Sequence, residues 1–304
     1  MKVLIVASHN NGRFAPFIME QAEALKGKGV DISYFGIQGK GLKGYIMAYP
    51  VLKSNIDKWH PDIIHAHYGL SGLLANIQRK IPVVTTYHGS DINQKRILPF
   101  SKACMALSRF NIFVSSKTLN IAKPRRHYAL IPCGVNISEL QLMGKEEAKQ
   151  EFQLDADKKY VLFAGAFDNP VKNAALAKST IELIPNADLL ELKGLSRENV
   201  TKLMCAADCF LMTSFSEGSP QVIKEAMACG CPIVSVDVGD VKNNLFGIDG
   251  CYIVPRDPHV IASTVKTVLA ANKRISGRER LVELGLTNDI VASKLMNIYN
   301  DIIK

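Results

Sequence analysis

The 304-residue sequence predicts an α/β protein made of two Rossmann-like domains, each with a parallel sheet. Short apolar runs of strand length alternate with amphipathic segments of helix length, which is typical of parallel strands joined by helical crossovers. Each half opens with a strand, a loop, a helix and a second strand, over residues 2–35 and 160–192. A chain of this length that is 47% hydrophobic and 21% charged can also fill two separate cores.

The first half begins with the apolar strand Lys2–Ala7 and the helical pattern Phe14–Lys26. The loop between them contains Gly12 and Arg13, and Gly12 allows the backbone to approach a ligand at the helix start. Residues 36–44 contain four glycines and two lysines and predict a flexible, basic surface loop. The other strands expected in this half are Val30–Phe35, 61–67, Ile81–Tyr87, Phe110–Ser115 and His127–Ile131.

Three histidines follow or occupy strands of the first half. His65 and His67 are two residues apart, so they point the same way from a strand. They would need a third ligand to hold a metal, and no residue has the spacing for that role. His88 follows the strand ending at Tyr87, at the edge where parallel sheets bind ligands. His88 is therefore either a site residue or a hydrogen-bonded structural histidine.

The second half repeats the alternation of strands and helices. Its expected strands are Tyr160–Gly165, Ala187–Leu192, Asp208–Met212, Pro232–Val236 and Cys251–Val254. The first expected helix of this half ends at about Ile184. The others are expected at Ser196–Ala206, from about residue 221 to Gly230, and at about 258–271 and 288–303.

Two carboxylates mark the segment 213–240. Glu217 lies on the polar turn after Met212, and Glu225 follows eight residues later in the helical pattern, a little over two turns on. The start of this helix offers free backbone N–H groups and the positive end of the helix dipole to a polyoxygen ligand. Two carboxylates at this spacing can grip sugar hydroxyls, or they can be a helix cap and a solvated side chain.

The string EGSPQVIKEAMACGCPIV resembles the nucleotide-sugar site of retaining glycosyltransferases with the GT-B fold, the group 1 type found in bacterial polysaccharide and glycolipid synthesis. That family carries two glutamates with seven residues between them. The resemblance implies that the first glutamate and the residues after it hold the transferred sugar, and that the second holds the ribose. The donor-binding positions are then Glu217, Gly218, Ser219, Pro220, Gln221 and Glu225.

The same resemblance extends to His88 and to the diphosphate. The string TYHGSD resembles the family segment whose histidine lies beside the donor sugar, so we expect His88 and Glu217 to be catalytic. Relatives commonly carry an arginine directly after the strand's glycine and a lysine about six residues later. Here Ala166 occupies the first position and Lys172 keeps the second. Lys172 should hold the diphosphate with one cation fewer, and Arg13 is a candidate substitute, although Lys172 could also be solvated.

The turn at Pro132–Asn136 resembles the family's entry into the second domain. We predict an acceptor domain at 1–135, a donor domain at 150–285, and a helix at 286–304 that returns toward the first domain. The resemblance implies two sheets facing across a cleft and transfer from a nucleoside-diphosphate sugar to a glycan or lipid-linked acceptor. It implies no cofactor and no obligatory metal, and we interpret Asp155-Ala156-Asp157 as a turn.

The net charge of +9 is concentrated in the first half. Residues 1–132 contain 18 Lys and Arg but only 6 Asp and Glu. Such an excess suits phosphates, nucleic acid or an anionic membrane, and we expect no nucleic-acid partner. The seven cysteines are scattered and odd in number, as in reduced proteins, and no apolar run is long enough for a signal peptide or a spanning helix. We expect a cytoplasmic protein whose basic first half is either a face that binds the inner side of the membrane or simply a soluble basic surface.

Two alternatives remain open. One is a sugar-nucleotide epimerase on the same fold, and the other is a donor-binding subunit without catalysis. The second alternative stays open because uncharged Ala166 occupies the position where relatives carry an arginine.

Overall fold

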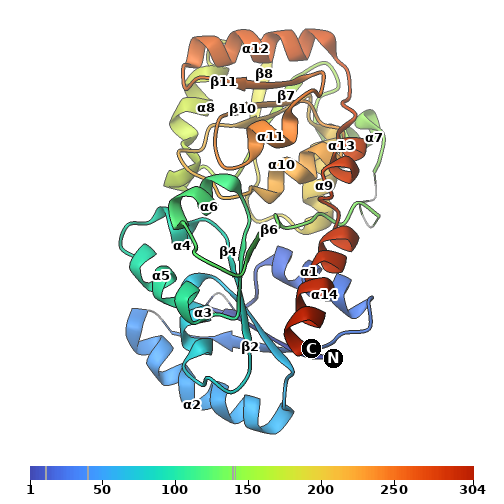
Figure 1. The fold of residues 1–304 in the computed structure, drawn as a ribbon. Helices are drawn as coiled ribbons and strands as arrows, with labels where there is room; N and C mark the ends of the chain where they lie inside the picture. Colours follow the sequence, from blue (N-terminus) through green and yellow to red (C-terminus); the bar gives the residue numbers. More distant parts are fainter. Residues whose placement is uncertain (11, 40, 139, 141) are drawn as a thin grey trace. The chain divides into compact units, whose positions relative to one another are not determined.

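The computed structural model describes residues 1–10, 12–39, 41–138, 140 and 142–304, and these form two compact units (Figure 1). The first unit comprises Met1–Gly134 and Asn288–Lys304, and the second comprises Val135–Thr287. Each unit has a parallel sheet with helices packed against it, so the predicted fold class is confirmed. Asn11 and Lys40, which belong to two predicted loops, lie outside the described residues.

The described part of the first unit contains a six-stranded parallel sheet in the order β2-β1-β3-β4-β5-β6. Its strands are β1 (Lys2–Ser8), β2 (Asp31–Ile37), β3 (Ile63–His67), β4 (Val83–Tyr87), β5 (Phe110–Phe113) and β6 (Tyr128–Leu130). Every residue of β3 and β4 is buried, as expected for central strands covered by helices on both faces.

Helices of the first unit connect its strands. They are α1 (Pro16–Lys26), α2 (Gly41–Trp59), α3 (Gly69–Asn76), α4 (Ser90–Asn93), α5 (Leu98–Leu107), α6 (Ser116–Ala122) and α14 (Asn288–Ile303). The last of these, α14, packs against α1, and the Lys28 ammonium lies 2.7 Å from the Asp289 carboxylate. Tyr299 of α14 is fully buried in the same core.

The prediction of a long basic loop at 36–44 was wrong. Strand β2 continues to Ile37 and α2 begins at Gly41, so the connection is short. Gly39 turns the chain there with φ of +100°. Leu52 and Ile56 of α2 are buried against the sheet, and this packing stabilises a helix whose first residues look like a loop in the sequence.

The described part of the second unit contains a five-stranded parallel sheet in the order β11-β10-β9-β7-β8. Its strands are β7 (Lys159–Phe163), β8 (Ala187–Glu191), β9 (Cys209–Met212), β10 (Ile233–Val236) and β11 (Cys251–Val254). Its helices are α7 (Lys145–Glu151), the 3₁₀ turn η1 (Pro170–Lys172), α8 (Ala174–Ile181), α9 (Arg197–Ala206), α10 (Gln221–Ala228), α11 (Val241–Leu245), α12 (Pro258–Ala271) and α13 (Gly277–Glu283).

The crossover predicted around Glu217 is present, because β9 leads through a loop and α10 to β10, which pairs with β9. Among the described helices, none is long and apolar enough to cross a lipid bilayer.

Candidate functional site

The loop 213–220 leaves the carboxyl end of β9 and is tied to the turn η1. The Thr213 hydroxyl donates to the Lys172 carbonyl at 3.0 Å. The Phe215 N–H donates to the Val171 carbonyl at 2.9 Å. Because β7 and β9 are neighbours in the sheet, these bonds gather two loops at the edge where parallel sheets bind ligands.

Lys172 and Glu217 form an ion pair at this edge. The Lys172 Nζ lies 2.8 Å from Glu217 Oε1, and the two side chains are 18% and 16% exposed. Gly165 makes room for the lysine stem, since a Cβ there would lie only 2.9 Å from Lys172 Cγ. The structure thus brings together the two charged groups to which the resemblance gave the phosphates and the transferred sugar. The prediction that Lys172 could be a solvated helix residue is wrong.

Gly218 and Ser219 are fixed against the loop that follows β10. The Ser219 hydroxyl donates to Asp240 Oδ2 at 2.6 Å. Gly239 has φ of +56°, and a Cβ there would lie 2.5 Å from the Gly218 carbonyl oxygen, so the close approach of the two loops requires glycine. Burial raises the pKa of the Asp240 carboxyl. The backbone of the glycine-serine turn is therefore held in one position by its neighbour.

Helix α10 begins at Gln221, and Pro220 occupies its N-cap position. The fully buried Lys224 donates from Nζ to the Gln221 side chain at 2.9 Å. Glu225 is 4% exposed and accepts from the Arg197 guanidinium at 2.5 Å. Glu225 is thus held in an ion pair, and the alternative of a solvated face residue is wrong for it.

The sequence analysis missed three charged residues at this edge: Arg197, Asp240 and Arg256. Arg256 Nη2 donates to the carbonyls of Ser214 and Phe215 at 2.8 and 3.2 Å. A signal for two of them was present, because Asp240 and Arg256 each follow a strand of the sheet by a few residues. The sequence carried no signal for Arg197, since its pairing with Glu225 depends on how α9 packs against α10.

Ala166 leaves an uncharged position directly after Gly165, as the sequence showed. The next N–H, of Phe167, donates to Glu191 Oε2 at 2.6 Å, so this short segment is held to the end of β8. Two cations contact the loop 213–220 in the described structure. Arg256 donates to the Ser214 carbonyl, and Lys172 pairs with Glu217 and accepts from Thr213 through its carbonyl.

In the first unit, His88 follows β4 and belongs to a series of three imidazoles. The rings of His65 and His67 stack with centroids 4.6 Å apart, as their alternation on β3 predicts. His67 Nδ1 lies 3.0 Å from His88 Nε2. At the other end, the Tyr299 hydroxyl lies 2.5 Å from His65 Nδ1. This series connects the candidate catalytic histidine to the core beneath α14.

Protonation of the two strand histidines is opposed by burial. Burial lowers the pKa of His65 to about 3, and burial together with the neighbouring imidazoles holds the pKa of His67 well below its ordinary value. Within the described chain, His67 Nε2 is buried without a hydrogen-bond partner. An unpaired acceptor is less costly than an unpaired N–H, which favours the tautomer that donates from His67 Nδ1 to His88 Nε2. His88 then carries its own proton on Nδ1.

Asp91 fixes the turn that carries His88. Its Oδ1 accepts from the N–H groups of His88 and Gly89 at 3.1 and 2.9 Å, and its Oδ2 accepts from Gly69 N–H at 3.0 Å. Gly89 has φ of +117°, a conformation that suits glycine. Burial raises the pKa of Asp91 to about 6, although the three N–H bonds act in the opposite direction.

Gly12 and Arg13 lie in the loop after β1. Arg13 lines a cavity of about 490 Å³ at the carboxyl edge of the first sheet, which Tyr68 and Asp91 also line. Tyr68 has φ of +72°, and its ring centroid is 4.7 Å from that of His88. Such strain in a tyrosine is typical of functional sites, and Tyr68 was missed because a backbone angle leaves no mark in the sequence. The predicted residues therefore form two groups, one on each unit.

The described residues contain no group of three or more His, Cys, Asp or Glu side chains arranged to hold a metal ion. The Asp157 N–H donates to Asp155 Oδ1 at 2.9 Å, which is the local hydrogen bond of a turn.

Comparisons with known proteins match both units to family models. Residues 162–271 match the family model described as Glycosyl transferases group 1, and residues 3–139 match the model described as Glycosyltransferase Family 4. Each unit matches a glycosyltransferase family. Together, the two matches include His88, Lys172 and both glutamates of the candidate site.

Curated relatives cover part of the chain. One is the putative teichuronic acid biosynthesis glycosyltransferase TuaC of Bacillus subtilis, 30% identical over 62% of this chain and 56% of its own length. Another is the D-inositol 3-phosphate glycosyltransferase of Mycolicibacterium vanbaalenii, 24% identical over 69% of this chain and 60% of its own length. The chain thus spans only 56% and 60% of the length of these two relatives.

Solved structures with the GT-B fold superpose on nearly the whole chain. Sucrose-phosphate synthase from Thermosynechococcus elongatus gives a TM-score of 0.86 at 18% identity, with 99% of both chains covered. HepE of Anabaena, solved in complex with UDP, gives a TM-score of 0.77 at 14% identity, with 99% of this chain and 100% of HepE covered. At these identities the likeness shows the fold.

Proposed function

We propose that this protein is a retaining, metal-independent glycosyltransferase that moves a hexosyl group from a nucleoside-diphosphate sugar to a glycan or lipid-linked acceptor. The observation that carries the proposal is the Lys172–Glu217 ion pair at the carboxyl edge of the second sheet. A cation and a carboxylate in contact suit a ligand that has phosphate oxygens beside sugar hydroxyls. The family matches on both units support the same reaction class.

Each charged group has a distinct role in this proposal. Lys172 turns from Glu217 to the diphosphate and stabilises the charge that develops on the leaving group. Glu217 accepts hydrogen bonds from hydroxyls of the transferred sugar. Glu225, held by Arg197, accepts from the ribose hydroxyls at the side of α10. The structures of HepE with UDP and with UDP-glucose support a nucleotide-sugar donor.

His88 lies beside the transferred sugar in this proposal. The acceptor hydroxyl attacks from the side of the leaving group, and a diphosphate oxygen takes its proton, so the donor's anomeric configuration is retained. His88 Nδ1 lies 3.7 Å from Cys133 Sγ, and in this proposal it turns its proton to a sugar hydroxyl when the donor binds, since His67 occupies its Nε2. Arg13 is the proposed second cation for the diphosphate.

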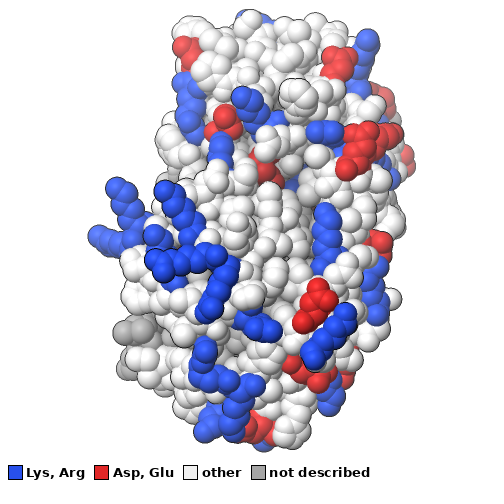
Figure 2. All heavy atoms as spheres, in the orientation of Figure 1, with Lys and Arg blue, Asp and Glu red and all other residues white. Residues whose placement is uncertain are grey.

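We base the proposed acceptor and membrane location on the names of the curated relatives and on the surface charge of the first unit. The name of TuaC places that protein in teichuronic acid biosynthesis, which supports a role in cell-surface polysaccharide synthesis here. Lys and Arg side chains gather over α4, α5 and α6 of the first unit (Figure 2), and exposed Phe100, Leu107 and Ile121 lie on the same helices or directly beside them. A basic face with apolar side chains suits peripheral binding to the anionic cytoplasmic leaflet.

A thermal-shift screen against nucleoside diphosphates and their sugars tests the proposal. A donor at 100 times its Kd should stabilise the protein by roughly 2.7 kcal/mol. Donor turnover without acceptor then separates an enzyme from a binding subunit, because only the enzyme releases sugar. The binding subunit stays an alternative because Ala166 lacks the charge of the usual arginine. An epimerase would instead convert the donor into a second nucleotide sugar, visible by NMR.

A further inference from the structure

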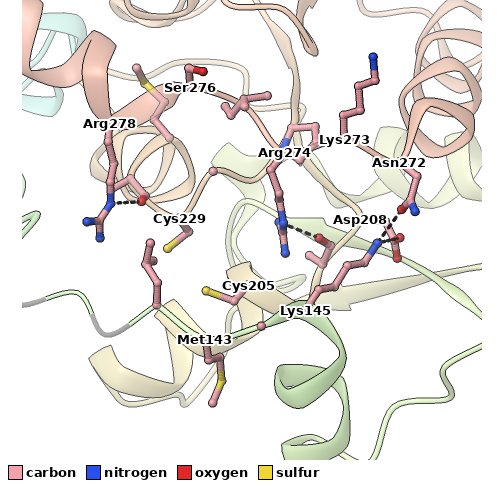
Figure 3. Close-up of a pocket in the computed structure, with 18 of the residues that line it drawn as sticks. Met143, Lys145, Cys205, Asp208, Cys229, Asn272, Lys273, Arg274, Ser276 and Arg278 are labelled. Carbon is pink, nitrogen blue, oxygen red and sulfur yellow. Dashed lines mark hydrogen bonds and ion pairs between the residues drawn. The ribbon is translucent and has the colours of Figure 1, made fainter.

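A second cavity of about 490 Å³ lies at the amino edge of the second sheet (Figure 3). It is lined by Asp208 and Pro232, which directly precede β9 and β10. The loops of the candidate donor site follow the carboxyl ends of the same strands, so the two sites lie at opposite edges. The end of α9, the end of α10 and the segment 272–279 form the walls of this cavity.

Two thiols meet in this cavity. Cys205 belongs to the last turn of α9, and Cys229 directly follows α10. Their sulfur atoms point toward one another (Figure 3), and each thiol shifts the pKa of the other. Cys229 Sγ also lies 3.8 Å from the Thr201 carbonyl, one helical turn before Cys205.

Two arginines hold the backbone beside these thiols. Arg274 Nη1 donates to the carbonyls of Met204 and Ala207, at 3.3 and 3.2 Å, on either side of Cys205. Arg278 Nε donates to the carbonyl of Ala228 at 2.8 Å, directly before Cys229. These bonds keep two fixed positive charges next to the thiol pair, where they favour a thiolate.

The charges and hydrogen bonds act unequally on the two thiols. Cys229, the Met143 N–H and the two arginines lower the pKa of Cys205 below its ordinary value in spite of burial. The same pairing raises the pKa of Cys229 far above its ordinary value, with added repulsion from Cys231 and Glu225. Lys145, paired with Asp208, and Lys273 complete the charged lining together with Glu279.

We propose that Cys205 and Cys229 form a redox-active dithiol, in which Cys205 is the nucleophile, Cys229 is the resolving thiol, and small peroxides are the oxidant. The Cys205 thiolate attacks one peroxide oxygen, the O–O bond breaks, and the leaving hydroxide takes a proton to become water. Cys229 then attacks the Cys205 sulfenic acid, the S–S bond forms, and a second water leaves with the Cys229 proton. The disulfide ties the end of α9 to the end of α10.

Peroxide treatment of the intact protein, followed by mass spectrometry without reduction, tests the dithiol. Hydrogen peroxide should remove two thiols and give one cross-linked pair of peptides containing Cys205 and Cys229. Cys229→Ser should stop at a sulfenic acid on Cys205 that dimedone captures. Cys104→Ser removes a buried thiol of the first unit and should oxidise like wild type. A Cys205 that stays reduced, or that oxidises without linking to Cys229, overturns the proposal.

Alkylation by iodoacetamide gives a second test, which keeps both cysteines in place. The rate at Cys205 should level off at a lower pH than that of an ordinary thiol, which gains rate up to about pH 8.5. Arg278→Gln should move the Cys205 profile to higher pH, and Arg280→Gln on the same helix should leave it in place. A Cys205 profile that continues to rise beyond pH 8 contradicts an activated thiolate.

Discussion

Glu217 and Glu225 stand eight residues apart but have different surroundings. Glu217 is partly exposed and shares an ion pair with Lys172, whereas Glu225 is almost fully buried against Arg197. A partly exposed pair can exchange its partner for a ligand at low cost, but a buried carboxylate keeps its partner. Substitution of the two glutamates should therefore affect different properties, the transfer rate for Glu217 and the nucleotide affinity for Glu225.

Glu217→Gln should lower the transfer rate by about 100-fold and leave nucleotide affinity within about threefold, because it removes charge at the sugar and not at the nucleotide. Glu225→Ala should weaken binding of the free nucleotide by about tenfold, since it removes the acceptor for the ribose. Calorimetry with free nucleotide and rates with the full donor measure both effects. Glu182→Gln, an exposed glutamate of the same unit, is the control. Equal losses of nucleotide affinity in both variants would refute this division of roles.

Lys172→Ala should remove most transfer activity, at least about 100-fold in kcat/KM, because one cation of the usual two is missing at Ala166. Ala166→Arg should be tolerated and should lower the donor KM by restoring a second cation beside the diphosphate. Lys266→Ala, an exposed lysine on α12, is the matched control and should behave like wild type. An unchanged kcat/KM in Lys172→Ala would remove this residue from the mechanism and favour a donor-binding subunit.

His88→Ala should lower turnover by about 100-fold while the thermal midpoint falls by only a few degrees, since His88 is half-buried at the sheet edge. His127→Ala, an exposed histidine before β6, serves as the control. Long-range ¹H–¹⁵N spectra of the imidazoles should also show a neutral His88 protonated at Nδ1. If the His88 variant keeps the wild-type rate with a measured donor, the histidine is structural.

At the scale of elements, helices with strong local signals were predicted with approximate bounds that the structure matches. We expected helices at 258–271 and 288–303, and α12 and α14 span Pro258–Ala271 and Asn288–Ile303. For α12 the reason is local chemistry, because the Asp257 carboxylate accepts from the N–H groups of His259 and Val260 and Pro258 takes the first position.

Elements that depend on tertiary packing were not predicted. Helix α2 starts among glycines and contains Pro50, so its sequence indicates a loop, and only burial of its apolar face explains the helix. The candidate site likewise contains residues that could be predicted from the sequence and contacts that could not. Its strand-end residues could be predicted from order along the chain, whereas the Arg197–Glu225 and His67–His88 contacts depend on which elements become neighbours.

The turn after β4 should make stability depend on pH through Asp91. Its raised pKa of about 6 means that the folded state binds a proton that the unfolded state releases near pH 4. The folded state should therefore lose up to about 3 kcal/mol as pH rises from about 4 to about 6. Thermal unfolding should show that wild type exceeds Asp91→Asn by more at about pH 4.5 than at about pH 7.5. A difference that does not vary with pH, as expected for the exposed control Asp57→Asn, would contradict this.

At the scale of the whole molecule, charge is divided along the chain. Residues 1–132 hold an excess of 12 positive charges, whereas the whole chain has +9. The first unit therefore contributes the attraction to anions, and the second unit contributes the paired charges of the candidate donor site.

The protein should sediment with vesicles that contain about 30% anionic lipid at low salt and should be released at high salt, because screening weakens attraction to the headgroups. Replacing Lys95, Arg96 and Lys102 together by Gln should weaken binding by about 100-fold, at roughly 1 kcal/mol for each charge. The same replacement at Lys178, Lys193 and Lys266 of the second unit is the matched control. No sedimentation at low salt would indicate a soluble acceptor.

Time-resolved ¹H NMR of the anomeric proton tests the central claim most directly, with whichever nucleotide sugar stabilises the protein in the thermal screen. The account predicts that the protein releases or transfers the sugar, and that the first product keeps the donor's anomeric configuration. Lys172→Ala should remove this signal while Lys266→Ala keeps it. An inverted first product would contradict the retaining mechanism, and a donor that binds tightly but never loses its sugar would contradict the enzyme itself.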